Sequence, residues 1–160
     1  MYTLPSDSPP LHLQVPEPPG GISIGVVWAS NPDNKKMYRS KSIPLELLMP
    51  HLLGLVKADL ASLHSLQVGD DAQQFEAYLP NESLYDWSSI VIDFKDTADI
   101  IRQLDLVISV DTAVAHLAAS LRKPTWLLLP FDSDFRWLRD RSDSPWYPGI
   151  MRLFRQSSHS

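Results

Sequence analysis

The chain has 160 residues, of which 44% are hydrophobic and 21% charged, a composition typical of one ordinary globular domain with a sizeable core. Its net charge of -5, with no basic run or stripe, argues against nucleic acid as a partner. It contains no cysteine, which excludes disulfides and thiolate metal sites, and no apolar run approaches the roughly 20 residues needed to span a bilayer. No signal peptide is visible, so we expect a cytoplasmic protein.

The chain begins with a proline-rich segment, residues 1–21, that ends on two glycines. Proline at this density precludes a helix or a central strand, so we expect an extended linker or a native N-terminal extension. A linker implies a further domain on its other side, which suggests that this chain was cut from a longer protein. A folded domain over residues 22–156 and a frayed tail over residues 157–160 complete the predicted organisation.

Within the predicted domain, strands and helices alternate. Short apolar, β-branched runs bounded by polar residues predict strands over residues 22–28, 61–66, 89–92, 106–110, 125–129 and 151–154. Apolar residues at helical spacing predict helices over residues 45–56 (kinked or ended early at Pro50), 70–79, 97–104 and 112–121. Asp96 and Asp111 are the expected caps of the last two helices.

Two segments have no regular periodicity. Residues 29–34 predict a polar loop, and residues 131–147, rich in Trp, Arg and Asp, predict a long loop with one or two helical turns. The alternation elsewhere predicts an α/β fold, namely a single Rossmann-like domain with a mostly parallel, doubly wound sheet of about six strands.

The sheet topology predicts where a ligand binds. In the common doubly wound order the first and fourth strands are neighbours, and ligands bind outside the carboxyl ends of those strands. This places the polar loop 29–34 and the polar cluster 111–116 around one crevice. The two most polar strand ends of the chain therefore converge there.

The cluster at 111–116 has the groups that suit a diphosphate. Thr112 and His116 are four residues apart, hence on one helix face, close to the free amides and positive dipole end of the helix start. In the alternative interpretation Asp111 merely caps the helix, and His116 bonds a backbone carbonyl. An ionised Asp111 in an anion site would repel phosphate, so it must turn aside, either to cap the helix or to meet a ribose hydroxyl.

Other motifs are absent or weak. The chain has neither a P-loop nor a GxGxxG fingerprint, and its histidines lack metal-ligand spacing. Arg39 and Lys41, expected in the connection after the first strand, are candidates for neutralising a phosphate. Gln67, at the end of the second strand, is a candidate for contacting a base or ribose.

An ordered series of short motifs gives the chain a family resemblance. The motifs are GVVWASNP (25–32), SIPL (42–45), SLQ (65–67), DTA (96–98), the segment 106–118, KP (123–124), LLPF (128–131) with Trp137, DSPWYP (143–148) and LFRQ (153–156). This set, spread over residues 22–156, resembles the C-terminal glycosyltransferase-like module of bacterial tetratricopeptide-repeat proteins. That module is similar to the ADP-heptose:lipopolysaccharide heptosyltransferases.

The resemblance implies a GT-B architecture, in which two Rossmann-like domains enclose the active site. The C-terminal domain holds the nucleotide-sugar donor, and the N-terminal domain supplies acceptor contacts and usually the catalytic carboxylate. Matched by motif, the donor-binding residues are Asp111, Thr112, Ala113 (in place of the usual Gly) and His116 at the diphosphate, Lys41 or its rival Arg39 as the basic phosphate contact, and Ser30, Asn31 and Gln67 along the donor crevice.

By this resemblance the chain is a donor-binding domain for a nucleoside-diphosphate sugar, needs no metal or redox cofactor, and is catalytically incomplete alone. Its full-length parent would be a metal-independent glycosyltransferase. The alternative is a non-catalytic protein-interaction module that keeps the fold, which Ala113 and the segment 131–147 motivate. The missing glycine fingerprint disfavours an NAD-type oxidoreductase. We also expect an exposed apolar surface where the other half would dock, through which the domain can form a homodimer.

Overall fold

The computed structural model describes residues 13–16, 21–129, 142 and 147–155. The elements are β1 (Ile22–Val27), α1 (Lys35–Lys41), α2 (Leu45–Lys57), β2 (Ala61–Ser65), the 3-10 helix η1 (Asp70–Tyr78), β3 (Leu84–Asp86), α3 (Phe94–Arg102), β4 (Leu106–Val110), α4 (Ala113–Ser120), β5 (Thr125–Leu129) and β6 (Met151–Arg155). They form a six-stranded parallel sheet in the order β3-β2-β1-β4-β5-β6. The predicted α/β, Rossmann-like fold is confirmed.

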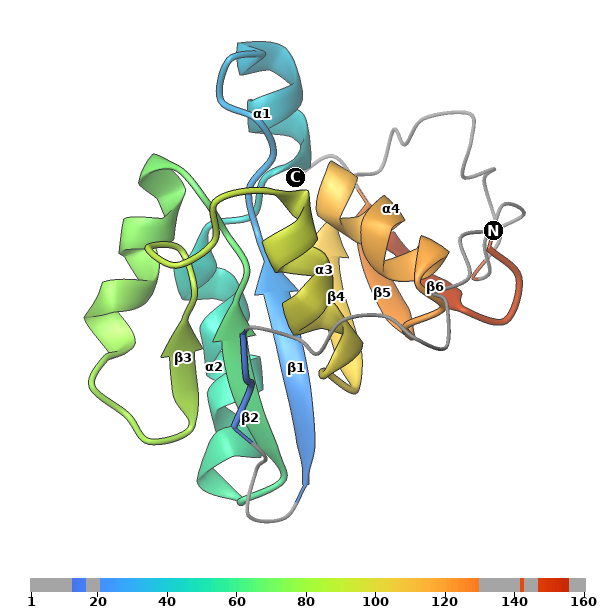
Figure 1. Ribbon diagram of the computed structural model, residues 1–160. Helices are drawn as coiled ribbons and strands as arrows, with labels where there is room; N and C mark the ends of the chain where they lie inside the picture. The colour runs from blue at the N-terminus through green and yellow to red at the C-terminus, as the bar shows by residue number, and fades with distance from the viewer. Residues whose placement is uncertain (1–12, 17–20, 130–141, 143–146, 156–160) are drawn as a thin grey trace.

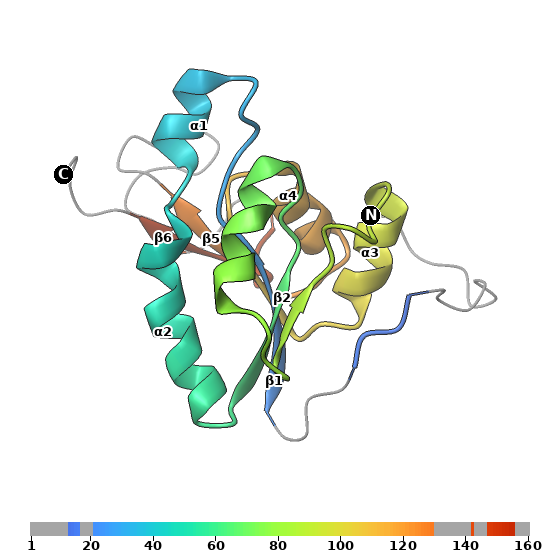
Figure 2. The same cartoon turned by 90° about the vertical axis from the view of Figure 1, so that its left-hand side faces the viewer.

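Helices cover both faces of the sheet, as Figures 1 and 2 show. On one face α2 and η1 pack against β1, β2 and β3 through a core that includes Trp28, Met49 and Phe75. On the other face α3 and α4 pack against β1 and β4, and α4 also covers β5 and β6. Because β4 and most of β1 are buried on both faces, their sequences are nearly continuous apolar runs.

Gly25 is required in β1 by close packing. A Cβ at this position would lie 2.7 Å from Cδ1 of Leu104 and 2.8 Å from Cδ1 of Leu66, and both leucines are buried. We therefore expect Gly25→Ala to lower the free energy of unfolding by about 2 kcal/mol in urea denaturation. Gly54→Ala in α2 is the control, since a Cβ at that position would meet nothing within 4 Å. This substitution should leave the free energy of unfolding unchanged or raise it. Equal effects of the two substitutions would contradict this packing argument.

Two helices differ from the sequence prediction. The segment expected to be an irregular connection contains α1, which buries none of its residues and so has no apolar periodicity to detect. Its start is fixed by Asn34, whose side chain accepts a hydrogen bond from the backbone N–H of Met37. The expected early stop at Pro50 is wrong, because α2 continues through it while Leu45, Met49 and Val56 stay buried against the sheet.

The third strand was predicted at the wrong place. β3 pairs with β2 through residues 84–86, whereas residues 89–92 form turns and a loop. The backbone N–H groups of Ile90 and Val91 both donate to the carbonyl of Trp87, which turns the chain away from the sheet. Ile90 and Ile92 are consequently exposed.

Both predicted helix caps are also wrong. Asp93 caps α3 by accepting from the backbone N–H of Asp96, while the carboxylate of Asp96 accepts from Ile92. The cap position of α4 is Thr112, one residue later than Asp111. The helical segment at 70–79 is confirmed as η1 and the last two strands as β5 and β6.

Part of the proline-rich segment packs against the domain. Gln103, at the end of α3, accepts from the backbone N–H of Val15 at 3.0 Å and donates to the carbonyl of Leu13 at 2.7 Å. Residues 1–12 and 17–20 of that segment, most of the predicted loop 131–147 and the tail 157–160 lie outside the described residues. Among the described helices, none is long and apolar enough to cross a membrane.

Candidate functional site

The candidate site lies where β1 and β4, neighbours in the sheet, reach its carboxyl edge. The chain leaves β1 into residues 28–34 and α1, and it leaves β4 into Asp111 and α4 (Figure 1). Nζ of Lys41 in α1 lies 3.1 Å from Oδ2 of Asp111, which joins the two strand ends across 70 positions of sequence. The predicted neighbour relation of the first and fourth strands is confirmed.

Asp111 is the centre of a small charged cluster. Its side chain is 4% exposed, and its second oxygen, Oδ1, lies 3.4 Å from Nε2 of His116. The carboxylate thus contacts Lys41 of α1 and His116 of α4, while the cap position of α4 is Thr112. A buried carboxylate needs such partners, since desolvation of an unpaired charge is costly.

His116 contacts two side chains from different elements. Besides Asp111, the hydroxyl of Tyr147 lies 3.3 Å from Nδ1, and the two rings are 5.9 Å apart. The alternative in which His116 bonds only a backbone carbonyl therefore does not describe this structure. Tyr147 has no assigned role in the sequence prediction, because nothing local in the sequence connects it with a helix that begins 34 positions earlier.

Thr112 and Ala113 form the start of α4 beside the charged cluster. The Ser109 hydroxyl donates to the carbonyl of Val110 at 2.7 Å, and Oγ1 of Thr112 lies 3.2 Å from the Ser109 oxygen. Thr112 is half-buried and Ala113, the first helical residue, is exposed. The first turn of α4, with its backbone amides, is therefore next to Asp111.

Ser30 and Asn31 lie in the loop after β1. The backbone N–H of Ser30 donates to the hydroxyl of Ser42 at 3.0 Å, while the Ser30 hydroxyl is buried without a hydrogen-bond partner among the described residues. Asn31 is exposed, and its side-chain oxygen accepts from the backbone N–H of Asp33. These bonds give the loop its shape next to the crevice.

Gln67 has a structural role that sequence reasoning missed. Its Oε1 accepts from the backbone N–H groups of Trp28 and Ala29, both at 3.0 Å, and its Nε2 donates to the carbonyls of Ala29 and Val68. The amide thus uses all its hydrogen-bonding capacity on backbone. Gln67 holds the exit of β1 against the end of β2, and in this structure it has no amide atom left for a base or ribose.

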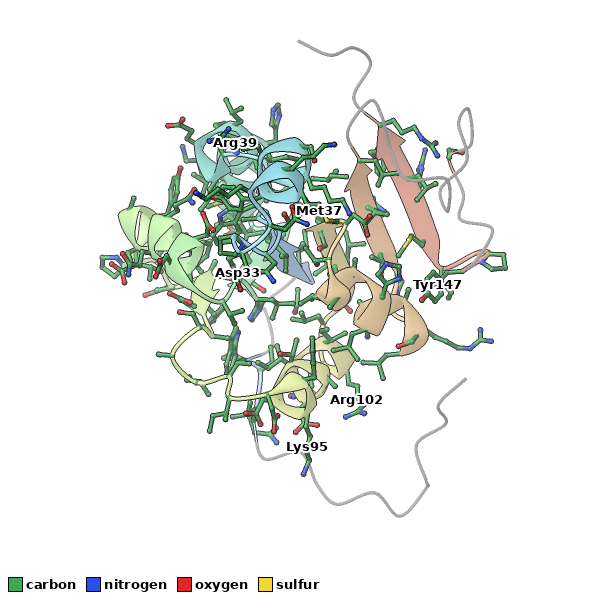
Figure 3. The ribbon with its side chains drawn as sticks, turned by 90° about the horizontal axis from the view of Figure 1, so that it is seen from above. Asp33, Met37, Arg39, Lys95, Arg102 and Tyr147 are labelled. Atoms are coloured by element: carbon green, nitrogen blue, oxygen red, sulfur yellow. The ribbon has the colours of Figure 1, made fainter. Side chains whose placement is uncertain are left out.

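Arg39 lies at a separate cavity of about 320 Å³. The cavity is lined by Trp28, Ala29, Tyr38, Arg39, Ser42, Ile43, Pro44, Asp71 and Gln74, and does not include the Asp111 cluster. From above, Arg39 extends from α1 and Tyr147 lies beside α4 (Figure 3). Of the two candidate cations, Lys41 is therefore the one that the fold brings to Asp111.

No group of side chains within the described part of the chain has the composition and spacing to hold a metal ion. Among the described residues, the polar groups gathered around the Asp111 carboxylate include the ammonium of Lys41, the imidazole of His116, the hydroxyls of Thr112 and Tyr147, and the start of α4. Such an arrangement can bind an anion through donors and a positive side chain.

The fold and the crevice define a Rossmann-like α/β domain with a polar site at the carboxyl edge of its sheet. Residues 91–128, which include α3, β4, Asp111 and His116, match the family model of glycosyltransferase family 9 (heptosyltransferase). No curated protein matches the chain.

Two solved structures share the fold. The chain is similar to the E. coli ADP-heptose LPS heptosyltransferase II, with a TM-score of 0.64, 15% identity, and coverage of 89% of this chain and 41% of that one. It is also similar to the E. coli heptosyltransferase WaaC with ADP, with a TM-score of 0.66, 15% identity, and coverage of 91% and 41%. The chain thus has a heptosyltransferase-like glycosyltransferase fold and spans about two fifths of the length of these structures.

Proposed function

We propose that this chain is the nucleotide-sugar donor-binding domain of a glycosyltransferase-like protein. The observation that carries the proposal is the cluster of Lys41, Asp111 and His116 at the start of α4, in the crevice between β1 and β4. The cluster lies at the position where a doubly wound sheet binds its ligand. Two of its residues, Asp111 and His116, belong to the segment that matches the glycosyltransferase model.

The donor diphosphate would be held by Lys41, by the hydroxyl of Thr112 and by the first-turn amides of α4 from Ala113 onward. These groups neutralise negative charge without a metal ion. Asp111 holds Lys41 and His116 in place before the donor arrives. The diphosphate then shares these two donors with Asp111, while Ser30 and Asn31 line the crevice and Gln67 keeps their loop in position.

Transfer of the sugar would need a second domain. The two heptosyltransferase structures described above are each more than twice as long as this chain, and we infer that the additional part supplies the acceptor contacts and the catalytic carboxylate. In that full-length protein, with tetratricopeptide repeats as the expected neighbour, the activity would be metal-independent glycosyl transfer. By itself this chain would bind the donor and transfer nothing.

Exposed apolar side chains at the carboxyl edge support a missing partner half. They come from α1, from the loop after β2, from the connection between β3 and α3 and from the first residue of α3, and they are Met37 at 41%, Val68 at 53%, Ile90 at 44%, Ile92 at 89% and Phe94 at 58% exposure. Several apolar residues exposed along one edge favour an interface. In the isolated domain the same edge offers a surface for a homodimer.

The proposal is tested by titrating the chain with ADP, GDP and UDP and following the shift of the melting temperature. Saturable binding of one nucleotide is expected, because a ligand that binds only the native state raises stability by mass action. Lys41→Met should weaken that binding about tenfold, since a charge-assisted contact to phosphate is lost. Lys57→Met, at the end of α2 on the opposite edge of the sheet, is the matched control and should bind as the wild type does.

The second candidate is a non-catalytic protein-interaction module. It is favoured by Ala113, whose methyl group narrows the approach of a phosphate to the helix start, and by the pairing of Lys41 with Asp111 in the free protein. A folded chain that binds none of the three nucleotides would support this second function and contradict the first.

A further inference from the structure

Tyr147 connects the start of β6 with the candidate site. Its backbone carbonyl accepts from the N–H groups of Ile150 and Met151, at 3.2 Å and 3.1 Å, so it is anchored in the turn that leads into β6. Its side chain packs against the apolar cluster formed by α4, β5 and β6, and its hydroxyl lies 3.3 Å from Nδ1 of His116. The backbone of Tyr147 is therefore fixed in this turn, while its side chain reaches the imidazole of His116.

The contacts of His116 favour one of its two neutral ring forms. Oδ1 of Asp111 lies 3.4 Å from Nε2, and an ionised carboxylate only accepts hydrogen bonds, so its charge favours the form that carries the proton on Nε2. In the neutral ring Nδ1 is then an acceptor, and the hydroxyl of Tyr147 is the group that donates to it. Lys41, Asp111, His116 and Tyr147 thus form one chain of polar contacts that runs from α1 to β6.

We propose that Tyr147 is a positioning residue for donor binding, an inference that rests on the proposed function. By donating to Nδ1 it holds the imidazole in the tautomer and ring orientation in which Nε2–H faces Asp111 at the crevice. An oxygen of the nucleotide sugar that binds beside Asp111 then accepts from an N–H group that is already oriented. Binding does not have to shift the imidazole from one tautomer to the other. Preorganised donors bind more tightly because less orientational freedom is lost on binding.

The first measurement concerns the ligand-free chain. In the wild type, the ¹⁵N resonance of Nδ1 of His116 should have the shift of a hydrogen-bonded acceptor nitrogen. In Tyr147→Phe, which keeps the ring and loses the hydroxyl, it should move toward the value of an unbonded acceptor, with the backbone amide spectrum reporting that the fold is intact. A free-acceptor shift already in the wild type, or an unchanged shift in the variant, would overturn the proposal without reference to any nucleotide.

The second measurement is nucleotide affinity, with ADP, GDP and UDP as probes. Tyr147→Phe should weaken the binding of the nucleotide that the wild type prefers by about fivefold, the effect of one modest hydrogen bond. Tyr85→Phe is the matched control, because Tyr85 is also a tyrosine whose ring lies beside a histidine, stacked on His64 at 4.7 Å, but it is outside the candidate site. It should leave both the His116 resonances and the affinity unchanged.

The outcomes separate the two proposals. Wild-type binding with no loss in Tyr147→Phe would overturn the positioning role and leave the donor-binding function standing. Absence of binding by the wild type would contradict the donor-binding function and, with it, the role of Tyr147 in binding. The ¹⁵N result would still decide whether Tyr147 sets the tautomer of His116.

Discussion

Replacing Gln67 with methionine is expected to lower the free energy of unfolding by about 3 kcal/mol. Methionine keeps the length and much of the volume of glutamine, but it leaves the buried N–H groups of Trp28 and Ala29 without an acceptor. Each buried donor left unsatisfied costs roughly 1–3 kcal/mol. Urea denaturation followed by tryptophan fluorescence measures the loss.

The control for this substitution is Gln73→Met in η1. Gln73 is exposed, so exchange of the same two residue types should change stability by less than about 0.5 kcal/mol. A similar loss in both variants would mean that the cost comes from methionine itself. A loss below about 1 kcal/mol at Gln67 would mean that water or a shift of the loop replaces the four hydrogen bonds of the amide.

The second large effect concerns pH and the buried His64. This side chain is fully buried in β2, where Nδ1 accepts from the indole N–H of Trp87 at 3.0 Å and Nε2 lies 3.3 Å from the hydroxyl of Ser62. Tyr85 and Trp87 stack on the ring. Burial lowers the pKa of His64 from 6.5 to about 4, because the charged imidazolium loses its hydration.

The sign of the pH effect follows from linkage. The unfolded chain, in which the pKa of His64 is near 6.5, takes up a proton at a higher pH than the native protein, in which the pKa is about 4. The stabilisation that comes from keeping His64 neutral is therefore complete above pH 6.5, and it is lost as the pH falls from 6.5 toward 4. A full pKa difference of about 2.5 corresponds to roughly 3 kcal/mol of lost stability.

Urea denaturation at several pH values between 4 and 7 measures this loss, and His64→Asn tests its origin. Asparagine offers a carbonyl oxygen near the position of Nδ1, so it can accept from Trp87 but does not titrate. The variant should be less stable at neutral pH and show a flatter dependence on pH. His51→Asn, at an exposed position of α2, should retain the wild-type slope. An undiminished slope in His64→Asn would assign the pH dependence to other groups.

Much of the fold could be predicted from patterns within single elements. The apolar runs of β1 and β4 indicate strands buried on both faces, and their alternation with helices is typical of a doubly wound sheet. For the elements whose burial produces no apolar pattern in the sequence, the predicted secondary structure is wrong. The helix α1 buries no residue, and β3 is three residues long, too short for a period to be detected.

The candidate site divides in the same way. The position of the crevice follows from strand order, and the polar cluster after β4 is visible in the sequence. The sequence does not show which side chains meet at the crevice. Asp111 meets Lys41 across 70 positions, Gln67 bonds backbone 39 positions away, and Tyr147 reaches His116 across 31 positions.

The sequence by itself determined the fold class and, once the common doubly wound strand order is assumed, the edge of the sheet at which polar groups collect. The fold class follows from hydrophobic periodicity and turn residues, which act within a few residues of one another. Only the tertiary structure decided that Lys41 and not Arg39 pairs with Asp111, that Gln67 holds the loop after β1, and that Tyr147 meets His116. Such pairs join elements that become neighbours through the order and register of the strands, and hydrogen bonds and ion pairs require their atoms to lie within about 3 Å of each other. A local sequence pattern contains no information about distances of that kind.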